Sequence, residues 1–600
     1  MSNCNFINNS ANRHVGGAVF WSGDNGTITN SIFISNKCII QCGGAIAWYS
    51  KNGTISDSNF TNNSIDYDAG GGGAVFLNAA NSIIKNCNFI NNTANRCSGG
   101  GVYWNSGDYG ILFGCTFIGN TAMWYGGGLE WHATNGALSN CTFIDNMANN
   151  SGGAVSWDGV NGALSNCTFI DNMANNSGGA VYNGYGYQYS LNLNCSIFSG
   201  NSANNGGGVY WDGGGGIFDC IFTDNTANNG GGAYFNRYCK LKGSIFSGNS
   251  ANNGGGIYTS STITFPECNF TDNSAIHGNN VYWYWTASTF LYNYNKINDY
   301  DYILIRNGTG TPSSTIILNQ KDITISSEGN VIFDAKGRNL HFEVTGDNVL
   351  IEKITFRNFN FTGNGGTINW QGNNGTLKNC NFNNNTAGIN GGAIFWEKSD
   401  GTLTNCNFIK NTANNGGAIY YNGNAANGNI INCKFTDNKA KSGGAIFWLG
   451  PNGKLVSSSF INNIATSNAG AVEWPGSKGT ILESTFNNNH ANNVGGGLHI
   501  DVANITIINS TFINNTAGNN GGAIYLDYEC SILNCNFIND KSINHKSNGI
   551  FAKNNLNING GKGIVDIVAG GTLSGASIVV LNNETYYYPP STNINFNYTK

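Results

Sequence analysis

Residues 135–155 read NGALSNCTFIDNMANNSGGAV, and residues 161–181 repeat this stretch letter for letter. The offset between the two copies is 26 residues in a chain of 600. Identical stretches in tandem are typical of repeat proteins, in which each unit packs only against its neighbours. The fold must therefore be deduced from this unit and its copies rather than from the chain as one compact domain.

Looser copies of the unit fill most of the chain, and each copy contains one phenylalanine that serves as an anchor for alignment. Successive anchors lie 24 to 29 residues apart within two sets, and a longer gap separates the sets. The anchors are Phe6, Phe33, Phe60, Phe89, Phe117, Phe143, Phe169, Phe198, Phe222, Phe246 and Phe270, followed by Phe356, Phe382, Phe408, Phe435, Phe460, Phe486, Phe512 and Phe537. The chain therefore contains two tandem arrays of the same unit.

Each unit reads approximately GGAIxW, then NGTLxNC, then xFxxNxA. Its three apolar pieces are short and are bounded by Gly, Asn or Asp, which is typical of strands separated by turns. No window sustains the i, i+3, i+4, i+7 apolar pattern of a helix. Three short strands with their turns fill one coil, and stacked coils would pair at about 4.8 Å per coil. The sequence predicts an all-β fold, a right-handed parallel β-helix in two tandem rods.

Alternation along the strand after GGA predicts which side chains face the core. The residue directly after GGA is aliphatic in nearly every unit and a tryptophan ladder lies two positions later, so both are expected to point inward. The position between them varies freely, which predicts that it faces solvent. It holds Phe20, Ala47, Tyr103, Glu130, Ser156, Tyr182, Tyr210, Glu473 and His499 in different coils.

Glycine and asparagine mark the predicted corners of the coil. The Gly pair before each strand predicts a tight corner, where a positive φ or a close backbone approach excludes a Cβ. The Asn three residues after each anchor predicts a stacked amide ladder at the next corner, because Asn tolerates the left-handed region and hydrogen-bonds to its copies above and below. Members of this ladder are Asn9, Asn36, Asn63, Asn120, Asn146, Asn385 and Asn411.

Seventeen cysteines suggest a disulfide scaffold, but their positions in the repeat argue otherwise. Eleven lie two residues before an anchor, and serine takes that place in other coils, as at Ser31 and Ser458. This position shares the inward parity of the anchor, so it predicts a buried ladder of thiols that act as small apolar residues. Cys38, Cys42 and Cys97 lie in turns, where a loop disulfide is an alternative. Without a Cys-x-x-Cys pair, neither a metal site nor a cofactor is predicted.

Charged residues make up 10% of the chain, and the net charge is −5 with no basic block. This composition argues against nucleic acid as a partner. No stretch approaches the roughly 20 apolar residues of a transmembrane helix, so no transmembrane segment is predicted. Met1 falls inside a repeat without a preceding secretory signal, and we therefore expect a fragment that lacks a signal and an N-terminal cap.

The GGA-aliphatic and FxxN motifs resemble the repeats of chlamydial polymorphic outer-membrane proteins. The whole unit, close to NGTLTNCNFINNTANNGGAIYW, is still more similar to the Asn- and Thr-rich adhesin-like proteins of methanogenic archaea. This resemblance covers about residues 1–290 and 350–560. It implies secretion, display at the cell surface and binding to glycans or other cells, and it supplies no catalytic residues. The sequence departs from that family in lacking a signal, a complete stalk and an anchor.

These patterns divide the chain into four predicted segments. Residues 1–295 are expected to form a first β-helix of about eleven coils, and residues 296–322 a transition segment. Residues 323–560 are expected to form a second β-helix of about eight coils, because residues 323–356 resemble the opening coils of such solenoids. Residues 561–600 resemble the beginning of an Ig-like β stalk domain.

An aromatic stripe occupies the position that is predicted to face solvent. Its candidate glycan-binding rings are Phe20, Tyr103, Tyr182, Tyr210, Phe395, Tyr420 and Phe447, and the stripe also includes Phe76, Phe235, Tyr258, Tyr282 and Tyr525. Rings on one face at the spacing of neighbouring strands are able to stack on sugar rings. The alternative, which we favour, is that they stack on each other and stiffen the sheet, as cross-strand aromatic pairs do.

Carboxylates and histidines form the second candidate site. Glu130 and His132 occupy one coil with Asp158 in the next, and Glu473 and His499 share a column one coil apart. Polysaccharide lyases and glycosidases on a β-helix place acids and bases on such a face. Ordinary polar variation is the alternative that we favour, because catalytic β-helices usually interrupt their repeats with long loops and these coils are regular. We therefore expect no enzyme, with a polysaccharide lyase or glycoside hydrolase as the alternative.

Two further sets of residues arise from the repeat itself. Neighbouring carboxylates two residues after an anchor invite Ca²⁺, but the Gly-Gly-x-Gly-x-Asp calcium repeat is absent and solvated side chains are expected; the set is Asp145, Asp171, Asp224, Asp272 and Asp437. Sequons are glycosylation candidates or by-products of an Asn- and Thr-rich unit; examples are Asn8, Asn62, Asn91, Asn384, Asn504, Asn514 and Asn583. Together the patterns predict an extracellular, adhesin-like structural protein whose partners are cell-surface glycans or partner-cell proteins.

Overall fold

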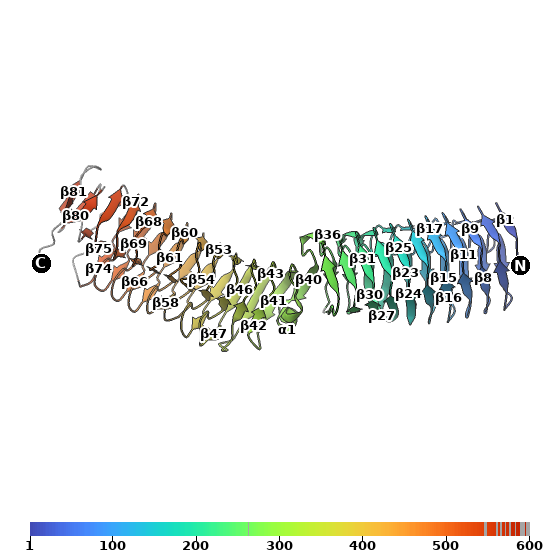
Figure 1. Ribbon diagram of the computed structural model, residues 1–600, viewed down its shortest axis with the longest axis horizontal. Helices are drawn as coiled ribbons and strands as arrows, with labels where there is room; N and C mark the ends of the chain where they lie inside the picture. The colour runs from blue at the N-terminus through green and yellow to red at the C-terminus, as the bar shows by residue number, and fades with distance from the viewer. Residues whose placement is uncertain are drawn as a thin grey trace. The chain divides into compact units, whose positions relative to one another are not determined.

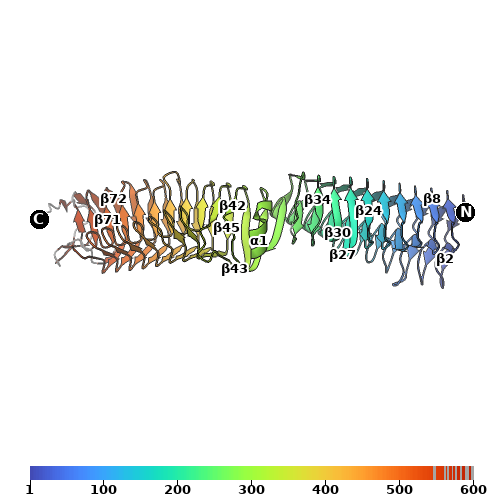
Figure 2. The same ribbon diagram turned by 90° about the horizontal axis from the view of Figure 1, so that it is seen from below.

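The computed structural model describes residues 1–261, 263–544 and 549–559, and past residue 559 only short strands. The fold is all-β, a right-handed parallel β-solenoid, as the repeats predict. Two compact units divide it: Met1–Tyr284 with Tyr300–Ile303, and Trp285–Asp299 with Leu304–Lys600. Within each unit, the strands of successive coils follow one another in chain order (Figures 1 and 2). No helix in the described residues is long and apolar enough to cross a membrane.

One coil contains four strands rather than the predicted three. A representative coil consists of β19 (Leu129–Trp131), β20 (Ala137–Ser139), β21 (Thr142–Ile144) and β22 (Met147–Ala148). The strand missing from the prediction, β22, is only two residues long and follows the asparagine corner, so it is too short to produce a visible alternation. Each strand pairs in parallel with its copy in the next coil.

The phenylalanine anchors stack in register through both units. In the first unit they lie on a sheet of eleven strands that runs from β1 (Asn5–Ile7) to β38 (Asn269–Thr271). Adjacent rings there are nearly parallel, with centroids 4.6 to 5.2 Å apart. The second unit repeats this stack from Phe356 to Phe537. The core is therefore a continuous column of identical side chains, as expected.

The second solenoid extends beyond its predicted boundaries at both ends. Strand β42 (Ile316–Leu318) lies inside the predicted transition segment, and it pairs in parallel with β44 (Phe342–Val344) of the second solenoid. Its coil carries neither GGA nor Trp, so the repeat pattern could not reveal it. At the other end, β78 (Ile567–Ala569) still pairs in parallel with β75 (Ile550–Ala552). Most of the predicted Ig-like segment, residues 561–600, lies outside the described residues.

A short helix, α1 (Ala287–Asn293), is the exception to the prediction that helices are absent. It begins after Thr286, whose side chain accepts a hydrogen bond from the backbone N–H of Thr289 at 3.1 Å. This is the usual N-cap arrangement, which satisfies one of the free N–H groups of the first turn. Phe290 is buried and packs against Phe333 of the same unit. With only seven residues, α1 is too short to show an apolar period in the sequence.

The glycine pairs form the tight corners that the sequence predicts. The first glycine of a pair has a positive φ, for example 65° at Gly391. The second has no room for a side chain, because a Cβ on Gly392 would lie 2.1 Å from the carbonyl oxygen of Gly417 in the next coil. The first position therefore requires glycine because of its positive φ, and the second because of the close backbone approach.

Tryptophan and a third glycine are coupled by size. The Trp396 ring is fully buried, and a Cβ on Gly401, in the following turn, would lie 2.1 Å from it. Most other coils with a tryptophan at this position show the same close approach, for instance Trp48 and Gly53, whereas among the described residues Trp211 and Trp283 have no glycine against their rings. Coils with a smaller side chain in the tryptophan column fill the glycine position instead: Leu77 with Ser82, Val344 with Val349, Ile500 with Ile505, and Leu526 with Cys530. The repeats thus conserve the combined volume of the two positions.

This coupling predicts a non-additive double mutant. Gly401→Ala alone should cost about 1–3 kcal/mol, because its new Cβ overpacks a buried ring. In a Trp396→Leu background the same change should cost less or become favourable, since the ring that it meets is gone. Hydrogen exchange of this coil measures both costs, with Gly423→Ala as control because nothing lies within 3.5 Å of a Cβ there. Equal costs in both backgrounds would contradict the coupling.

The cysteine ladder is buried, as predicted. The backbone N–H groups of Cys87, Cys115 and Cys141 each donate to the sulfur of the cysteine in the next coil, at 3.3 to 3.5 Å. Serine at this position makes the equivalent bond, from Ser31 to Ser58 at 3.1 Å. The position therefore selects a small side chain with one acceptor atom.

The loop disulfide is not formed. Cys38, Cys42 and Cys97 are buried together in one apolar cluster with Ile65, Phe76 and neighbouring alanines. All seventeen cysteines, each within the described part of the chain, are free thiols. Burial raises the pKa of Cys42 to about 11 and that of Cys97 to about 12, so neither is a reactive thiolate at neutral pH.

The asparagine ladder is present and uses every polar atom of the amide. Asn411 is fully buried, and its Oδ1 accepts from the backbone N–H and the Nδ2 of Asn385 at 3.1 and 2.9 Å. Its Nδ2 donates to Asn438 Oδ1 and to the carbonyl oxygen of Phe382, both at 3.0 Å. The left-handed residue, however, is the one before the ladder, such as Asn384 with a φ of 56°. That part of the prediction is wrong.

Candidate functional site

The column between the aliphatic and tryptophan positions, here called the outer column, is covered in most coils. The prediction that it faces solvent is wrong for Ala47, Glu130, Ser156, Tyr182, Glu473 and His499, which are at most 6% exposed. Tyr103 and Tyr210 are half-buried, and Phe20 alone among the predicted examples is exposed, at 55%. Strand alternation correctly predicts that these side chains point away from the core, but it does not predict that other residues cover them.

The cover over the outer column is the segment that leads to the glycine corner. In the first unit Cys42 and Cys97 from this segment pack with Phe76 of the outer column. A Cβ on Gly71, in the same segment, would lie 2.5 Å from the Tyr103 ring. The chain therefore passes directly over the outer column before it turns into the next strand.

Aromatic side chains of the outer column stack on each other, which is the alternative favoured above. Phe395, Tyr420 and Phe447 form one stack with centroids 5.3 and 5.1 Å apart. Tyr182 and Tyr210 begin another, at 5.4 Å, that continues through Tyr234, Tyr258, Tyr282 and Tyr302. Phe235 was misplaced, since it is fully buried in the tryptophan column. Ring faces that contact each other are not available to a sugar, and the glycan-binding role of these residues stays a prediction.

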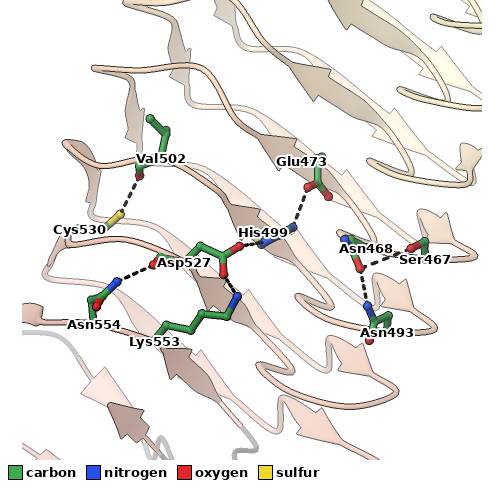
Figure 3. A network of polar contacts seen from close by, with 10 residues as sticks. All are labelled: Ser467, Asn468, Glu473, Asn493, His499, Val502, Asp527, Cys530, Lys553 and Asn554. Atoms are coloured by element: carbon green, nitrogen blue, oxygen red, sulfur yellow. Dashed lines mark hydrogen bonds and ion pairs between the residues drawn. The ribbon is translucent and has the colours of Figure 1, made fainter. Parts of the chain in front are cut away.

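A polar network interrupts the outer column of the second unit (Figure 3). Glu473 lies in β63 (Val472–Trp474) and His499 opposite it in β67 (Leu498–Ile500), as the shared column predicts. His499 Nδ1 lies 2.6 Å from Glu473 Oε1, and its Nε2 lies 2.8 Å from Asp527 Oδ2. Lys553, one coil further on, forms an ion pair with the other oxygen of Asp527. The four side chains form one chain of alternating charge.

Charge pairing outweighs burial throughout this network. Burial lowers the pKa of His499, but its contacts with Glu473 and Asp527 raise it above the ordinary value overall. Burial raises the pKa of Asp527, but Lys553 and His499 together hold it below its usual range. Asp501, close by, has a pKa raised by burial and by the charge of Asp527. The carboxylates on either side favour the protonated form of His499, which makes the network a set of mutually dependent charges.

Asp527 and Lys553 were not identified from the sequence. Both occupy the position directly after the tryptophan column, where Asp158 and His132 lie in the first unit. Coil lengths that vary from 24 to 29 residues hide this correspondence until the strands are placed in register. Aligning every repeat on its tryptophan column rather than on its phenylalanine anchor would have revealed it.

A second polar cluster lies in the first unit, at Glu130, His132 and Asp158. Glu130, in β19, is 1% exposed, and its Oε1 lies 2.7 Å from Nε2 of His132 in the same coil. One ligand-type atom from each of the three residues lies within 4.8 Å of the other two. The structure thus brings together the three residues that the sequence grouped.

Like charges crowd this cluster. Burial and the neighbouring Glu130 raise the pKa of Asp158 to about 6, against the opposing effect of His132. Burial lowers the pKa of His132, but Glu130 and Asp158 raise it above its ordinary value overall. The second oxygen of Glu130, Oε2, is buried without a hydrogen-bond partner. Two carboxylates therefore share a single imidazolium.

The remaining candidates lie on the corners of the coils. Asp145 and Asp171, with the other aspartates two residues after an anchor, hold left-handed backbone with φ near 55°, a position that favours Asn, Asp and Gly. That requirement accounts for their recurrence. The sequon asparagines Asn8, Asn62, Asn91, Asn384, Asn504 and Asn514 are exposed, and Asn583 lies outside the described residues.

Comparison with known proteins supports the fold and the repeat. The profile of a family described as right-handed β-helix region matches residues 16–196 and 304–461, more than half of the chain. The Chlamydia polymorphic membrane protein repeat matches residues 243–260 and 509–527. No curated protein matches the chain.

Solved structures similar to this chain include two of the PL6 family alginate lyase AlyGC, one of them a mutant. The mutant enzyme is 10% identical, with a TM-score of 0.24, and the alignment covers 85% of this chain and 93% of the lyase. The other structure is 11% identical with a TM-score of 0.20 and the same coverage. The family match, the parallel register and the stacked anchors agree, and the chain belongs to the right-handed β-helix family.

Proposed function

We propose that this chain is a structural module of a cell-surface, adhesin-like protein and is not an enzyme. The observation that carries the proposal is the unbroken register of the coils. In each unit the phenylalanine stack and the asparagine ladder run from coil to coil, with every ladder amide bonded to its neighbours. A solenoid of this kind is stabilised by contacts between adjacent coils, so each added repeat lengthens the rod with the same contacts.

The kind of repeat supports secretion and surface display. The match to the polymorphic membrane protein repeat supports a place at the cell surface. The full unit also resembles adhesin-like proteins of methanogenic archaea, a resemblance that implies binding to glycans or other cells. Low charge and many Asn and Thr side chains suit a surface that contacts glycans or proteins of other cells through neutral hydrogen bonds.

Recognition through exposed edges fits the geometry better than recognition through the aromatic stripe. Phe395 and Tyr182 are buried, and Tyr103, Tyr210, Tyr420 and Phe447 contact other rings with their faces. These rings therefore serve the stiffness of the sheet. The exposed asparagine and threonine side chains at the corners are left to contact a partner.

An adhesion assay with the full chain tests the proposal. Beads coated with the chain should retain cells or glycans. The triple variant Tyr103→Ala, Tyr210→Ala, Tyr420→Ala should lose thermal stability but should bind cells or glycans as the unmodified chain does. Labelling of intact source cells with an antibody to the chain should detect it at the surface. Detection only after lysis would contradict the proposal.

A panel of acidic and neutral polysaccharides tests the alternative. The proposal predicts that none is shortened by the unmodified chain. Cleavage that is abolished by Glu130→Gln with Glu473→Gln would replace it with a lyase or glycoside hydrolase, acting through Glu130, His132, Asp158, Glu473 and His499.

A further inference from the structure

The cluster of Glu130, His132 and Asp158 differs from the network of the second unit in one respect, its charge balance. Around His499 two positive groups, His499 and Lys553, face the carboxylates of Glu473 and Asp527. In the described part of the chain, the imidazole of His132 is the one basic group recorded beside Glu130 and Asp158. The first cluster is therefore one positive charge short of the second.

Gly184 explains why no protein cation fills that place. Asp158 follows the tryptophan column as Asp527 does, and Gly184 stands one coil further on, where the second unit has Lys553. A Cβ on Gly184 would lie 1.5 Å from Asp158 Oδ1, so the carboxylate occupies the space that any side chain there would need. The chain thus has no side chain at Gly184, and the Asp158 carboxylate remains beside Glu130 and His132.

Glu130 supplies an independent indication of a ligand. It is 1% exposed, one oxygen contacts His132, and the other has no hydrogen-bond partner. A buried carboxylate oxygen without a partner costs about 1–3 kcal/mol or more, unless something neutralises it.

We propose that Glu130, His132 and Asp158 form a binding site for a divalent transition-metal cation of the Zn²⁺ or Mn²⁺ type. One imidazole nitrogen and two carboxylates are a ligand set that these ions accept, and three protein ligands leave at least one position for water. A bound cation would lie between the two carboxylates, and the imidazole would bind it in its neutral form.

The cation chemistry follows from the ligands. An imidazole nitrogen favours Zn²⁺ or Mn²⁺ over Ca²⁺, which takes six to eight oxygen ligands. The three ligand atoms lie within 4.8 Å of one another, and a small contraction would let all three reach one Zn²⁺ at bond lengths of roughly 2.0–2.2 Å. His132, half-exposed at 36%, is the residue able to move, and it also gives the ion a path from solvent.

Calorimetry with ZnCl₂ or MnCl₂ and the full chain tests the site. The background carries Cys195→Ser, because Cys195 is an exposed thiol and thiolates are strong Zn²⁺ ligands. One site should be titrated, and Glu130→Gln, His132→Gln and Asp158→Asn should each weaken it by at least about 100-fold, since even outer partners of metal ligands are worth 10- to 100-fold. Asp145→Asn, an exposed aspartate of the same unit, is the matched control and should bind as the parent does.

A crystal grown with Zn²⁺ gives the decisive geometry. An anomalous difference peak should lie about 2.0–2.2 Å from one atom of each of the three residues. His132→Gln, at the most exposed of the three positions, is the variant least affected by folding, so its binding result stands even if a buried variant fails to fold. Unchanged Zn²⁺ and Mn²⁺ affinity in His132→Gln, or a peak elsewhere in the chain, would overturn the proposal.

Discussion

Replacing Asn411 with leucine is expected to destabilise the surrounding coils by about 2–6 kcal/mol. The change leaves the backbone N–H and the Nδ2 of Asn385 without their acceptor, in a position with no access to water. Each buried donor that loses its partner costs about 1–3 kcal/mol. Asn438 Oδ1 and the carbonyl oxygen of Phe382 each lose a donor as well. The estimate counts only the two donors of Asn385, so it is a lower bound on the destabilisation.

Hydrogen exchange with peptide resolution is the measurement that suits a solenoid. A long repeat array does not unfold in one step, so a single melting temperature would mix the response of distant coils. Faster exchange should be centred on β50 (Asn381–Asn383), β54 (Asn407–Ile409) and β57 (Lys434–Thr436) and should fade within a few coils.

The control lies one residue before the ladder, in the preceding coil. Asn384 is exposed and left-handed, and glycine occupies the equivalent position at Gly119, Gly200 and Gly248. Asn384→Gly should therefore alter exchange little. An equal effect of Asn384→Gly and Asn411→Leu would show that the ladder amide has no special role.

Asn411→Asp separates hydrogen bonding from charge. The chain contains a natural example, since Asp540 takes the ladder position after Asn515 and accepts both of its bonds at 2.8 Å. Burial raises the pKa of Asp540 to about 7. A folded-state pKa above the unfolded value means that stability is highest at low pH and falls as pH rises from about 4 to 7. Asn411→Asp should follow the same course. Its hydrogen exchange should be close to that of the wild type at pH 4.5 and much faster than that of the wild type at pH 8.

The success of the sequence in predicting the core has a simple physical origin. Phe382 pairs with Phe408, and Asn385 with Asn411, because identical coils stack in register and each column repeats one environment. A position that alternates between cysteine and serine reports the size and polarity of its surroundings in the same way. The nineteen anchors show nineteen times which residue types a given position of the coil accepts. A single non-repetitive sequence shows each position only once and lacks this information.

The outer column could not be predicted by the same reasoning. Glu130 and His499 alternate correctly with their inward neighbours, yet they are buried because another segment of the coil passes over them. Free variation at a position indicates solvent only if nothing covers it. Here the covering residues change from coil to coil: cysteines lie over Phe76, and ion-paired side chains surround His499. The residue in the outer column varies together with the residues that cover it.

Polar networks were visible only in part for a related reason. Glu473 and His499 were grouped because they share one column, but Asp527 reaches His499 from a different column. Contacts between columns depend on side-chain direction and on turn length, which repeat periodicity does not encode. The helix α1 and the strand β42 lie where the repeat is absent, and there the sequence carried no comparable redundancy.

His499→Leu is expected to cost about 3–5 kcal/mol near pH 6, measured by hydrogen exchange in β63, β67 and β71 (Ile524–Leu526). The substitution keeps much of the buried volume but leaves Glu473, 6% exposed, without its positive partner. Asp527 still has Lys553, so the loss should be concentrated on the side of Glu473.

The pH dependence gives this prediction its sign. The pKa of His499 is raised in the folded state by Glu473 and Asp527, which outweigh its burial. Stabilisation by a raised histidine pKa is complete below the unfolded value of about 6.5 and is lost as pH rises through the folded value. Wild-type exchange in these strands, corrected for intrinsic rates, should therefore accelerate as the pH rises above about 6.5. His499→Leu should lack that step, so the two proteins should converge at high pH.

Two further variants separate charge from packing at this position. Glu473→Gln removes the larger of the two contacts that raise the pKa of His499, so the alkaline step should move to lower pH without disappearing. His490→Gln, at a half-buried histidine bonded only to Asn492 in the same turn, should change local stability by no more than about 0.5 kcal/mol. If the alkaline step persisted unchanged in His499→Leu, another group would control it, and the alternating charges of Glu473, His499 and Asp527 would have to be regarded as independent of one another.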